Sequence, residues 1–290
     1  MDQKPAFGCL KYSEQHAPGV GLTLDISEIL ASEQSAYQRI TFYRNPYLGV
    51  FFTLDGYIQL TEGDEFAYHD MIVHPAMAVN PQIKNVLVIG GGDGGTVREL
   101  CRYPTIEKII MVEIDERVVR LSQKFLPSTA CVIDNDSRLT NIYEDGLTYI
   151  KNSASAQLDL IIVDSTDPIG SGEGLFSREF YHNCHRALNK NGILINQHES
   201  AFYPWDGYEM KRANDKIKSV FPIAKVYGFN MPSYASGYWY FGFAAKNLDP
   251  VSDIKAEQWQ NFGLETKYYN IELHKAAFAL PSYVKKLLSE

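Results

Sequence analysis

Six carboxylates follow stretches that the sequence predicts to be buried strands, and these side chains could bind and act on a cationic ligand. They are Asp93, Glu113, Asp145, Asp164, Asp167 and Glu199. The carboxyl ends of parallel strands share one edge of a sheet, which is where ligands bind in such folds. The turns expected at this edge contain no lysine or arginine to neutralise the acids. The edge is therefore predicted to be strongly anionic, and its simplest complement is a polycation.

A glycine-rich turn, NVLVIGGGDGG, indicates a second feature of the ligand. An apolar strand precedes glycines at Gly90, Gly92 and Gly95, which is the spacing of a nucleotide-binding turn. The unusual residue is Asp93, because its carboxylate would repel the pyrophosphate of a dinucleotide. The turn thus favours a nucleoside-type ligand that carries positive charge at this point. Glu113 follows about 20 residues later, where a Rossmann-type site places its ribose-binding acid.

Several of these residues also have a purely structural interpretation. Asp145 precedes Gly146 and would suit a helix N-cap as well as a ligand contact. Asp164 and Asp167 could cap turns, although two acids at a buried strand end are costly without cations. On the residues alone, His69 is more readily an interface histidine than a site residue. By the same standard Tyr68, Tyr234 and Trp239 would ordinarily be packing residues.

The composition excludes several classes of protein. The chain has 290 residues, a net charge of -8, 45% hydrophobic and 21% charged residues, which is typical of a globular protein. The acidic balance gives no electrostatic case for nucleic acid or an anionic membrane. No stretch approaches the roughly 18 apolar residues of a membrane helix, and the N-terminus lacks an apolar signal core. Four scattered cysteines without a CxxC motif predict a reduced, cytoplasmic compartment and no structural zinc.

The elements that must position these residues fall into two predicted parts, an antiparallel β-domain over 1–62 and a Rossmann-like catalytic domain over 63–290. Residues 1–18 are expected to be irregular, and alternating apolar and polar residues then predict strands up to Leu60. Asp55-Gly56 is the strongest hairpin signal. A helix follows at the junction, and Pro75 is expected to kink or end it.

Beyond residue 85 the chain alternates strands and helices. Strands are expected over 86–89, 108–115, 139–143, 158–164 and 193–197, with an edge hairpin over 224–229 and 238–245. Helices are expected over 96–102, 117–125, 146–151, 177–188, 207–220 and 283–288. Repeated strand–helix units predict an α/β fold with a doubly wound, mostly parallel sheet and right-handed crossovers.

Taken together, these motifs resemble the polyamine aminopropyltransferases, and bacterial spermidine synthases most closely. The matching stretches are LDGYIQLTEGDEFAYHDM, VLVIGGGDGGTVRE, MVEIDERVV, YEDGLTYI, DSTDP with GLFSREFY, INQHES, MPSYASGYW and KYYNIELHKAAFALP. The resemblance implies a methyltransferase-type Rossmann-like sheet behind the β-domain, and a homodimer or homotetramer. It implies transfer of an aminopropyl group from decarboxylated S-adenosylmethionine to a diamine, with putrescine as the family default. The donor is then a co-substrate, and no cofactor or metal is expected.

The resemblance also assigns site residues by matching positions. The donor contacts are Gln38, Gly90, Gly92, Asp93, Glu113, Asp145, Gly146 and Ser171. The amine contacts are His69, Asp93, Asp164, Asp167 and Tyr234. Asp164 would accept the proton and the Tyr68 hydroxyl would help to aim the amine. The family usually has proline where this chain has Ser171, and the resulting IGSGEG loop predicts a more mobile lid.

The mechanism that the resemblance implies follows from the charges on the two reactants. A sulfonium already activates the adjacent CH₂, so no metal is required. An alkyl amine with a pKa of ~10.4 is protonated at neutral pH and cannot attack until a base removes a proton. Asp164 would be that base. Asp93 would hold the donor's ammonium and repel the carboxylate of intact S-adenosylmethionine.

Four alternatives remain open at this point. The same transfer could be made to cadaverine, agmatine or spermidine. A methyltransferase would share the sheet and the glycine turn but would prefer intact S-adenosylmethionine. A nicotinamide dehydrogenase fits the glycine spacing, although Asp93 opposes its pyrophosphate. A non-catalytic polyamine-binding protein would bind a diamine and release no methylthioadenosine.

Overall fold

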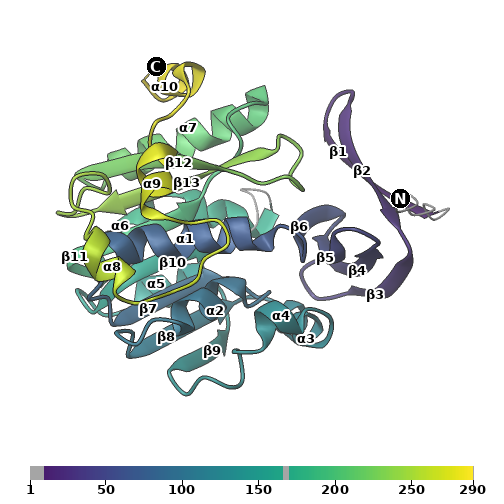
Figure 1. Ribbon diagram of the computed structural model, residues 1–290, viewed down its shortest axis with the longest axis horizontal. Helices are drawn as coiled ribbons and strands as arrows, with labels where there is room; N and C mark the ends of the chain where they lie inside the picture. Colours follow the sequence, from purple (N-terminus) through teal and green to yellow (C-terminus); the bar gives the residue numbers. More distant parts are fainter. Residues whose placement is uncertain (1–9, 166–169, 290) are drawn as a thin grey trace.

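The computed structural model describes residues 10–165 and 170–289. A smaller β-region, drawn in purple, stands beside a larger α/β body, and β1 and β2 project from it as a separate ribbon (Figure 1). β1 (Leu10–Ala17) pairs antiparallel with β2 (Val20–Ile26). The expectation that residues 1–18 are irregular is therefore wrong over 10–17. The polar composition of β1 made the strand hard to predict, because only Tyr12 of its side chains is buried.

The second sheet of the β-region has the order β3-β4-β5-β6 and is antiparallel throughout. Its strands are β3 (Glu28–Gln34), β4 (Arg39–Asn45), β5 (Gly49–Leu54) and β6 (Tyr57–Thr61). The hairpin predicted at Asp55-Gly56 is confirmed. Both residues have positive φ, 50° and 92°, as the tight turn of a two-residue hairpin requires.

Helix α1 (Glu65–Val79) runs from the β-region across the face of the large sheet, and it is buried on nearly every side (Figure 1). Pro75 was expected to kink or end this helix, and the expected end is wrong because α1 continues to Val79. A kink at Pro75 stays a prediction. A proline inside a helix leaves the carbonyl of residue i−4 without its usual donor. Here the Tyr227 hydroxyl donates to that carbonyl, on Met71, at 2.8 Å. A side chain from a distant strand thus supplies the hydrogen bond that Pro75 cannot make.

The large sheet confirms the predicted doubly wound α/β fold, with strand order β12-β13-β11-β10-β7-β8-β9. Its strands are β7 (Asn85–Gly90), β8 (Lys108–Glu113), β9 (Leu139–Tyr143), β10 (Leu158–Asp164), β11 (Leu188–Gln197), β12 (Ile223–Asn230) and β13 (Tyr238–Ala245). The strands from β11 to β9 pair in parallel, and β12 and β13 form the expected antiparallel hairpin at the edge. The chain starts at β7, proceeds outward to β9 and then returns to β10 on the other side of β7. The order of strands therefore switches between β7 and β10, where such sheets open a crevice for ligands.

Helices cover both faces of this sheet, as a buried parallel sheet requires. They are α2 (Gly95–Cys101), α3 (Glu116–Phe125), α4 (Pro127–Ala130), α5 (Gly146–Asn152), η1 (Gly170–Phe176), α6 (Arg178–Ala187), α7 (Pro204–Lys218), α8 (Ala256–Gln260), α9 (Ile271–Ala277) and α10 (Ser282–Ser289). The short segments α4, α8 and α9 were not predicted. No helix in the described part of the chain is long and apolar enough to cross a membrane.

Candidate active site

A cavity of about 360 Å³ lies at the switch point between β7 and β10, and the β-region closes one side of it. Nine carboxylates line it: Glu14, Glu65, Asp93, Glu113, Asp145, Asp164, Glu199, Asp206 and Glu209. Lysine and arginine are absent from its wall among the described residues. Five of the six carboxylates singled out in the sequence are thus brought to one cavity, and it is anionic as predicted. Asp167 lies outside the described residues.

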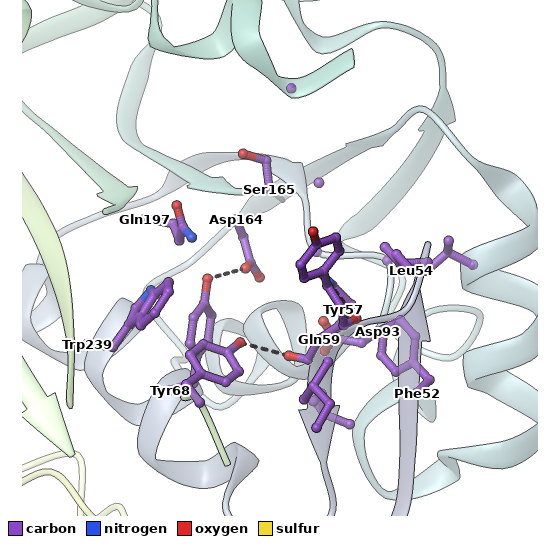
Figure 2. Close-up of a pocket in the computed structure, with 18 of the residues that line it drawn as sticks. Phe52, Leu54, Tyr57, Gln59, Tyr68, Asp93, Asp164, Ser165, Gln197 and Trp239 are labelled. Atoms are coloured by element: carbon purple, nitrogen blue, oxygen red, sulfur yellow. Dashed lines mark hydrogen bonds between the residues drawn. The ribbon is translucent and has the colours of Figure 1, made fainter. Parts of the chain in front are cut away.

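By strand order, the residues that line the cavity fall on two sides of Asp164, which we call the β8 branch and the β11 branch. The β8 branch is lined by Gln38, Val112, Glu113, Ile114, Val118, Asp145 and Gly146. The β11 branch is lined by Tyr68, Gln197, Glu199, Trp205, Asp206, Ser233, Tyr234 and Trp239. Figure 2 shows Asp164 with Gln197 and Trp239 on one side and Phe52 and Leu54 of β5 on the other. A ligand with two parts could therefore place one part on each side of this carboxylate.

The glycine turn allows side chains and backbone to approach one another closely. A Cβ on Gly90, whose φ is 83°, would lie 2.1 Å from the Asp164 carbonyl oxygen. That carbonyl accepts a hydrogen bond from Gly91 N at 2.8 Å, which ties β10 to the turn. A Cβ on Gly95 would lie 2.1 Å from the His69 ring. These glycines were expected to admit a ligand to the backbone, and the structure shows that they also admit residues of the cavity itself.

In the β8 branch, Glu113 is buried and accepts a hydrogen bond from Asp115 N at 2.9 Å. Burial and the neighbouring carboxylates raise the pKa of Glu113 to about 7. Gln38 lines the same branch and donates from its amide to Asp115 at 3.1 Å. Asp145 caps α5 by accepting from Leu147 N at 3.1 Å and Thr148 N at 3.2 Å. Asp145 is therefore both the helix cap and a wall residue, and the two interpretations of this residue are compatible.

At the glycine turn, His69 lies between two carboxylates. Its Nδ1 is 2.5 Å from Glu65 and its Nε2 is 3.2 Å from Asp93. Burial alone would lower the pKa of His69, but the two carboxylates raise it to about 10. The imidazolium and the Gly95 N–H in turn hold the pKa of Asp93 below its usual range despite burial. On the residues alone His69 was interpreted as an interface histidine, and the structure places it in the cavity wall.

Asp164 receives one hydroxyl on each carboxylate oxygen. Tyr68 donates to Oδ1 at 2.8 Å, as Figure 2 shows, and Thr96 donates to Oδ2 at 2.6 Å. Burial and the nearby Asp93 carboxylate raise the pKa of Asp164. The charge on His69 and the two hydroxyl donors oppose that rise. Thr96 was missed in the sequence, because nothing in the motif distinguishes it from any threonine in the first turn of a helix.

The β11 branch contains an aromatic cluster and a polar outer wall. The Tyr234 ring meets Trp239 edge-on at 4.8 Å, and its hydroxyl donates to the Gln59 carbonyl at 2.8 Å. These rings pack as expected and also line the cavity. Farther out, His16 Nε2 contacts Asp206 at 2.7 Å. This pair joins β1 to α7 across 190 positions, so no local pattern could have indicated it.

The lid expected around IGSGEG is not described in full. Gly170–Phe176 forms η1, but the side chain of Ser171 and all of 166–169 lie outside the described residues. The predicted roles of Asp167 and Ser171 and the predicted mobility of the lid therefore stay predictions.

Among the residues that the structure describes, two groups of side chains have ligand atoms close enough to share a cation. They are His69, Asp93 and Asp164 in the cavity, and Asp70, His74 and Glu99 between α1 and α2. In each group the pKa of the histidine is raised by the carboxylates that flank it. The resulting imidazolium already compensates their charge, so we assign neither group to a metal.

Comparison with known proteins places the chain among aminopropyl-transferring enzymes. Residues 65–256 match the spermine/spermidine synthase domain, and residues 11–62 match the spermidine synthase tetramerisation domain. A polyamine aminopropyltransferase of Clostridium acetobutylicum is 58% identical over 275 residues, covering 95% of this chain and 96% of that protein. One from Clostridium botulinum (strain Eklund 17B) is 55% identical over 281 residues, covering 97% and 98%.

Solved structures agree with these relatives. A spermidine synthase in complex with the transition state analogue AdoDATO has a TM-score of 0.94 and 41% identity, covering 100% of this chain and 98% of that one. The spermidine synthase of Thermotoga maritima has a TM-score of 0.92 and 40% identity, with the same coverage.

Proposed function

The chain belongs to the spermine/spermidine synthase family, and we propose that it transfers an aminopropyl group from decarboxylated S-adenosylmethionine to putrescine, giving spermidine and 5′-methylthioadenosine. The observation that carries this proposal is the pair of carboxylates at the switch point. Asp93 stands in the nucleotide turn and Asp164 stands across from it with two hydroxyl donors. Such a pair complements two cationic reactants that must meet.

The donor fits the β8 branch and the glycine turn. We assign the nucleoside and thioether part to Gln38, Gly90, Gly92, Glu113, Asp145, Gly146 and Ser171. An ionised Glu113 can accept hydrogen bonds from ribose hydroxyls. Asp93 would hold the ammonium of the aminopropyl group. Intact S-adenosylmethionine would bring a carboxylate to the same place, and its repulsion from Asp93 would exclude it.

The acceptor amine fits the β11 branch, where we assign it to Tyr68, His69, Asp164, Asp167 and Tyr234. A protonated amine donates one proton to the Asp164 carboxylate and becomes a nucleophile. The nitrogen then attacks the CH₂ beside the sulfonium, a C–N bond forms, and the C–S electron pair passes to sulfur. The products are a neutral thioether, a secondary ammonium and a protonated Asp164, so charge and atoms balance. Holding both reactants in line supplies a large part of the rate.

Assembly and location belong to the same proposal. The match of residues 11–62 to a tetramerisation domain supports an oligomer, and we propose a homodimer or homotetramer. The division at residues 62 and 63, the cytoplasmic location and the absence of a cofactor stay predictions.

The test is incubation with decarboxylated S-adenosylmethionine and a panel of amines, with products identified by mass. We expect spermidine and methylthioadenosine when putrescine is the acceptor. A larger yield with cadaverine, agmatine or spermidine would correct the acceptor. Transfer of a methyl group, or tighter calorimetric binding of intact S-adenosylmethionine, would overturn the proposal. Binding of diamine without release of methylthioadenosine would indicate a non-catalytic protein.

A further inference from the structure

We propose that Thr96 is a positioning residue for this reaction, whose hydroxyl fixes the Asp164 carboxylate and keeps it ready to accept a proton. The inference rests on the proposed function, because it concerns Asp164 as the proton acceptor. Thr96 is not one of the described residues that line the cavity, so it would act through its hydrogen bond to Asp164.

The contact is direct and fully enclosed. Thr96 lies in the first turn of α2 with 0% of its surface exposed, and its hydroxyl donates to Asp164 Oδ2 at 2.6 Å. A threonine hydroxyl inside a helix commonly bonds a carbonyl of the preceding turn. The hydroxyl of Thr96 instead reaches a residue 68 positions away. Since buried hydroxyls are costly to leave unpaired, this bond orients both partners.

Two donors from two helices define the plane of the carboxylate. The Tyr68 hydroxyl from α1 bonds Oδ1 and the Thr96 hydroxyl from α2 bonds Oδ2. A carboxylate oxygen accepts about two hydrogen bonds, so each oxygen of Asp164 keeps one position for another donor. Because both hydroxyls fix the plane of the carboxylate, the free acceptor position on each oxygen points in a fixed direction. An ammonium in the β11 branch could then meet a base that does not have to rotate.

The two helices are held together by a line of charges that are buried except for the partly exposed Arg98. Its members, in order, are Glu65, Arg98, Glu99, His74 and Asp70. Neighbouring members approach one another at 2.9–3.4 Å, and the line crosses between α1 and α2 twice, from Glu65 to Arg98 and from Glu99 to His74. Asp70 also accepts hydrogen bonds from Tyr268 N at 2.8 Å and Tyr269 N at 3.1 Å. The spacing of the two donors around Asp164 is therefore set by contacts that run from Glu65 in the cavity wall to Asp70 behind it.

The electrostatic surroundings explain why a donor is needed at this position. Among the described residues, the titratable groups that face Asp164 are Tyr68 and His69 from α1, Asp93 from the glycine turn and Glu113 from β8. Burial and Asp93 favour the protonated form of Asp164, which cannot act as a base. The hydroxyl of Thr96 lowers the pKa of Asp164 by stabilising the charged form. Without it a larger share of the enzyme would enter the reaction already protonated.

The test compares Thr96→Val, which keeps the shape of the side chain, with Thr96→Ser, which keeps the hydroxyl. The rate of spermidine formation is measured against pH with saturating donor. For Thr96→Val we expect the acid limb of kcat/KM to move about one pH unit higher and kcat at neutral pH to fall about tenfold, the scale of one lost hydrogen bond to a charged group. Thr96→Ser should keep the acid limb of kcat/KM at its wild-type pH. Thr140→Val is the matched control, since Thr140 is exposed on β9 outside the cavity and should leave the profile unchanged.

Three results would overturn the inference. One is a Thr96→Val enzyme with the wild-type limb. Another is an equal loss of kcat in Thr96→Val and Thr96→Ser, which would indicate packing alone. If Thr96→Val does not fold, Thr96→Cys replaces it. A thiol is a weaker donor than a hydroxyl, so the acid limb of kcat/KM for Thr96→Cys must lie between those expected for Thr96→Val and the wild type. A wild-type acid limb for Thr96→Cys is the third result that would overturn the inference. A wild-type enzyme that makes no spermidine would instead refute the proposed function, so the two failures are distinguishable.

Discussion

Asp164→Asn removes the proposed base while keeping nearly every contact around it. The amide has the shape of the carboxylate, so its oxygen can still accept from the Tyr68 hydroxyl that now bonds Oδ1 at 2.8 Å. Its NH₂ group would replace Oδ2, and the Thr96 hydroxyl can rotate to accept from it. The Gly91 N bond to the carbonyl of residue 164 involves only the backbone and is unaffected. The substitution therefore tests proton transfer with little change in packing.

The magnitude follows from the role. Loss of a general base typically lowers turnover by 10²–10⁴-fold, which corresponds to about 3–5 kcal/mol of barrier. The thermal stability of Asp164→Asn, unlike its turnover, should not fall. Burial and Asp93 raise the pKa of Asp164 in the folded state, so ionisation of Asp164 opposes folding. The penalty is complete above the folded pKa, shrinks as pH falls below it and disappears below the lower pKa of the unfolded chain. Removing the charge should therefore leave the melting temperature at pH 7 equal to or above that of the wild type.

Three measurements on one preparation separate these effects. Release of methylthioadenosine gives turnover, calorimetry gives the affinity for methylthioadenosine, and thermal unfolding gives stability. We expect turnover to fall by at least 100-fold while affinity and melting temperature are retained. Turnover within about tenfold of the wild type would refute Asp164 as the base. A loss of turnover together with a lower melting temperature would show that the substitution damages the fold instead.

Two further predictions concern the network around the cavity. His69→Asn removes the imidazolium between Glu65 and Asp93 and should cost about 3 kcal/mol of unfolding free energy at neutral pH, measured by urea denaturation. The pKa of His69 rises from 6.5 to about 10 on folding. The contribution of His69 to the unfolding free energy is therefore complete below pH 6.5 and is lost as pH rises through 10. If His69→Asn loses stability over this pH range as steeply as the wild type, His69 is not the charged group that stabilises the fold. Tyr227→Phe removes the donor to the Met71 carbonyl and should cost about 1–3 kcal/mol without affecting turnover, and an unchanged urea midpoint would show that α1 tolerates Pro75 unaided.

The parts of the fold that rest on local patterns were predictable from the sequence. The buried strands β7, β8 and β10 are continuous apolar runs, and the turn at Asp55-Gly56 has the residues that positive φ demands. The edge that collects the carboxylates follows from strand order alone. These features depend on neighbours in sequence, or on a topology that repeated strand–helix units impose.

The features that could not be predicted depend on partners distant in the chain. Pro75 stays inside α1 because Tyr227, 152 positions beyond it, supplies a hydroxyl to the preceding turn. The imidazole of His69 enters the cavity wall only because Gly95 leaves room for it. Thr96 reaches Asp164 from the start of α2 to the end of β10, and His16 reaches Asp206 across two domains of the prediction. Each is a tertiary contact that no periodicity records.

The most direct test is a crystal structure with 5′-methylthioadenosine and putrescine bound together. We expect the thioether sulfur at the Gly90–Gly95 turn and one putrescine nitrogen within hydrogen-bond distance of Asp164, about 3 Å. A putrescine nitrogen held elsewhere, with Asp164 bonded only to Tyr68 and Thr96, would contradict it.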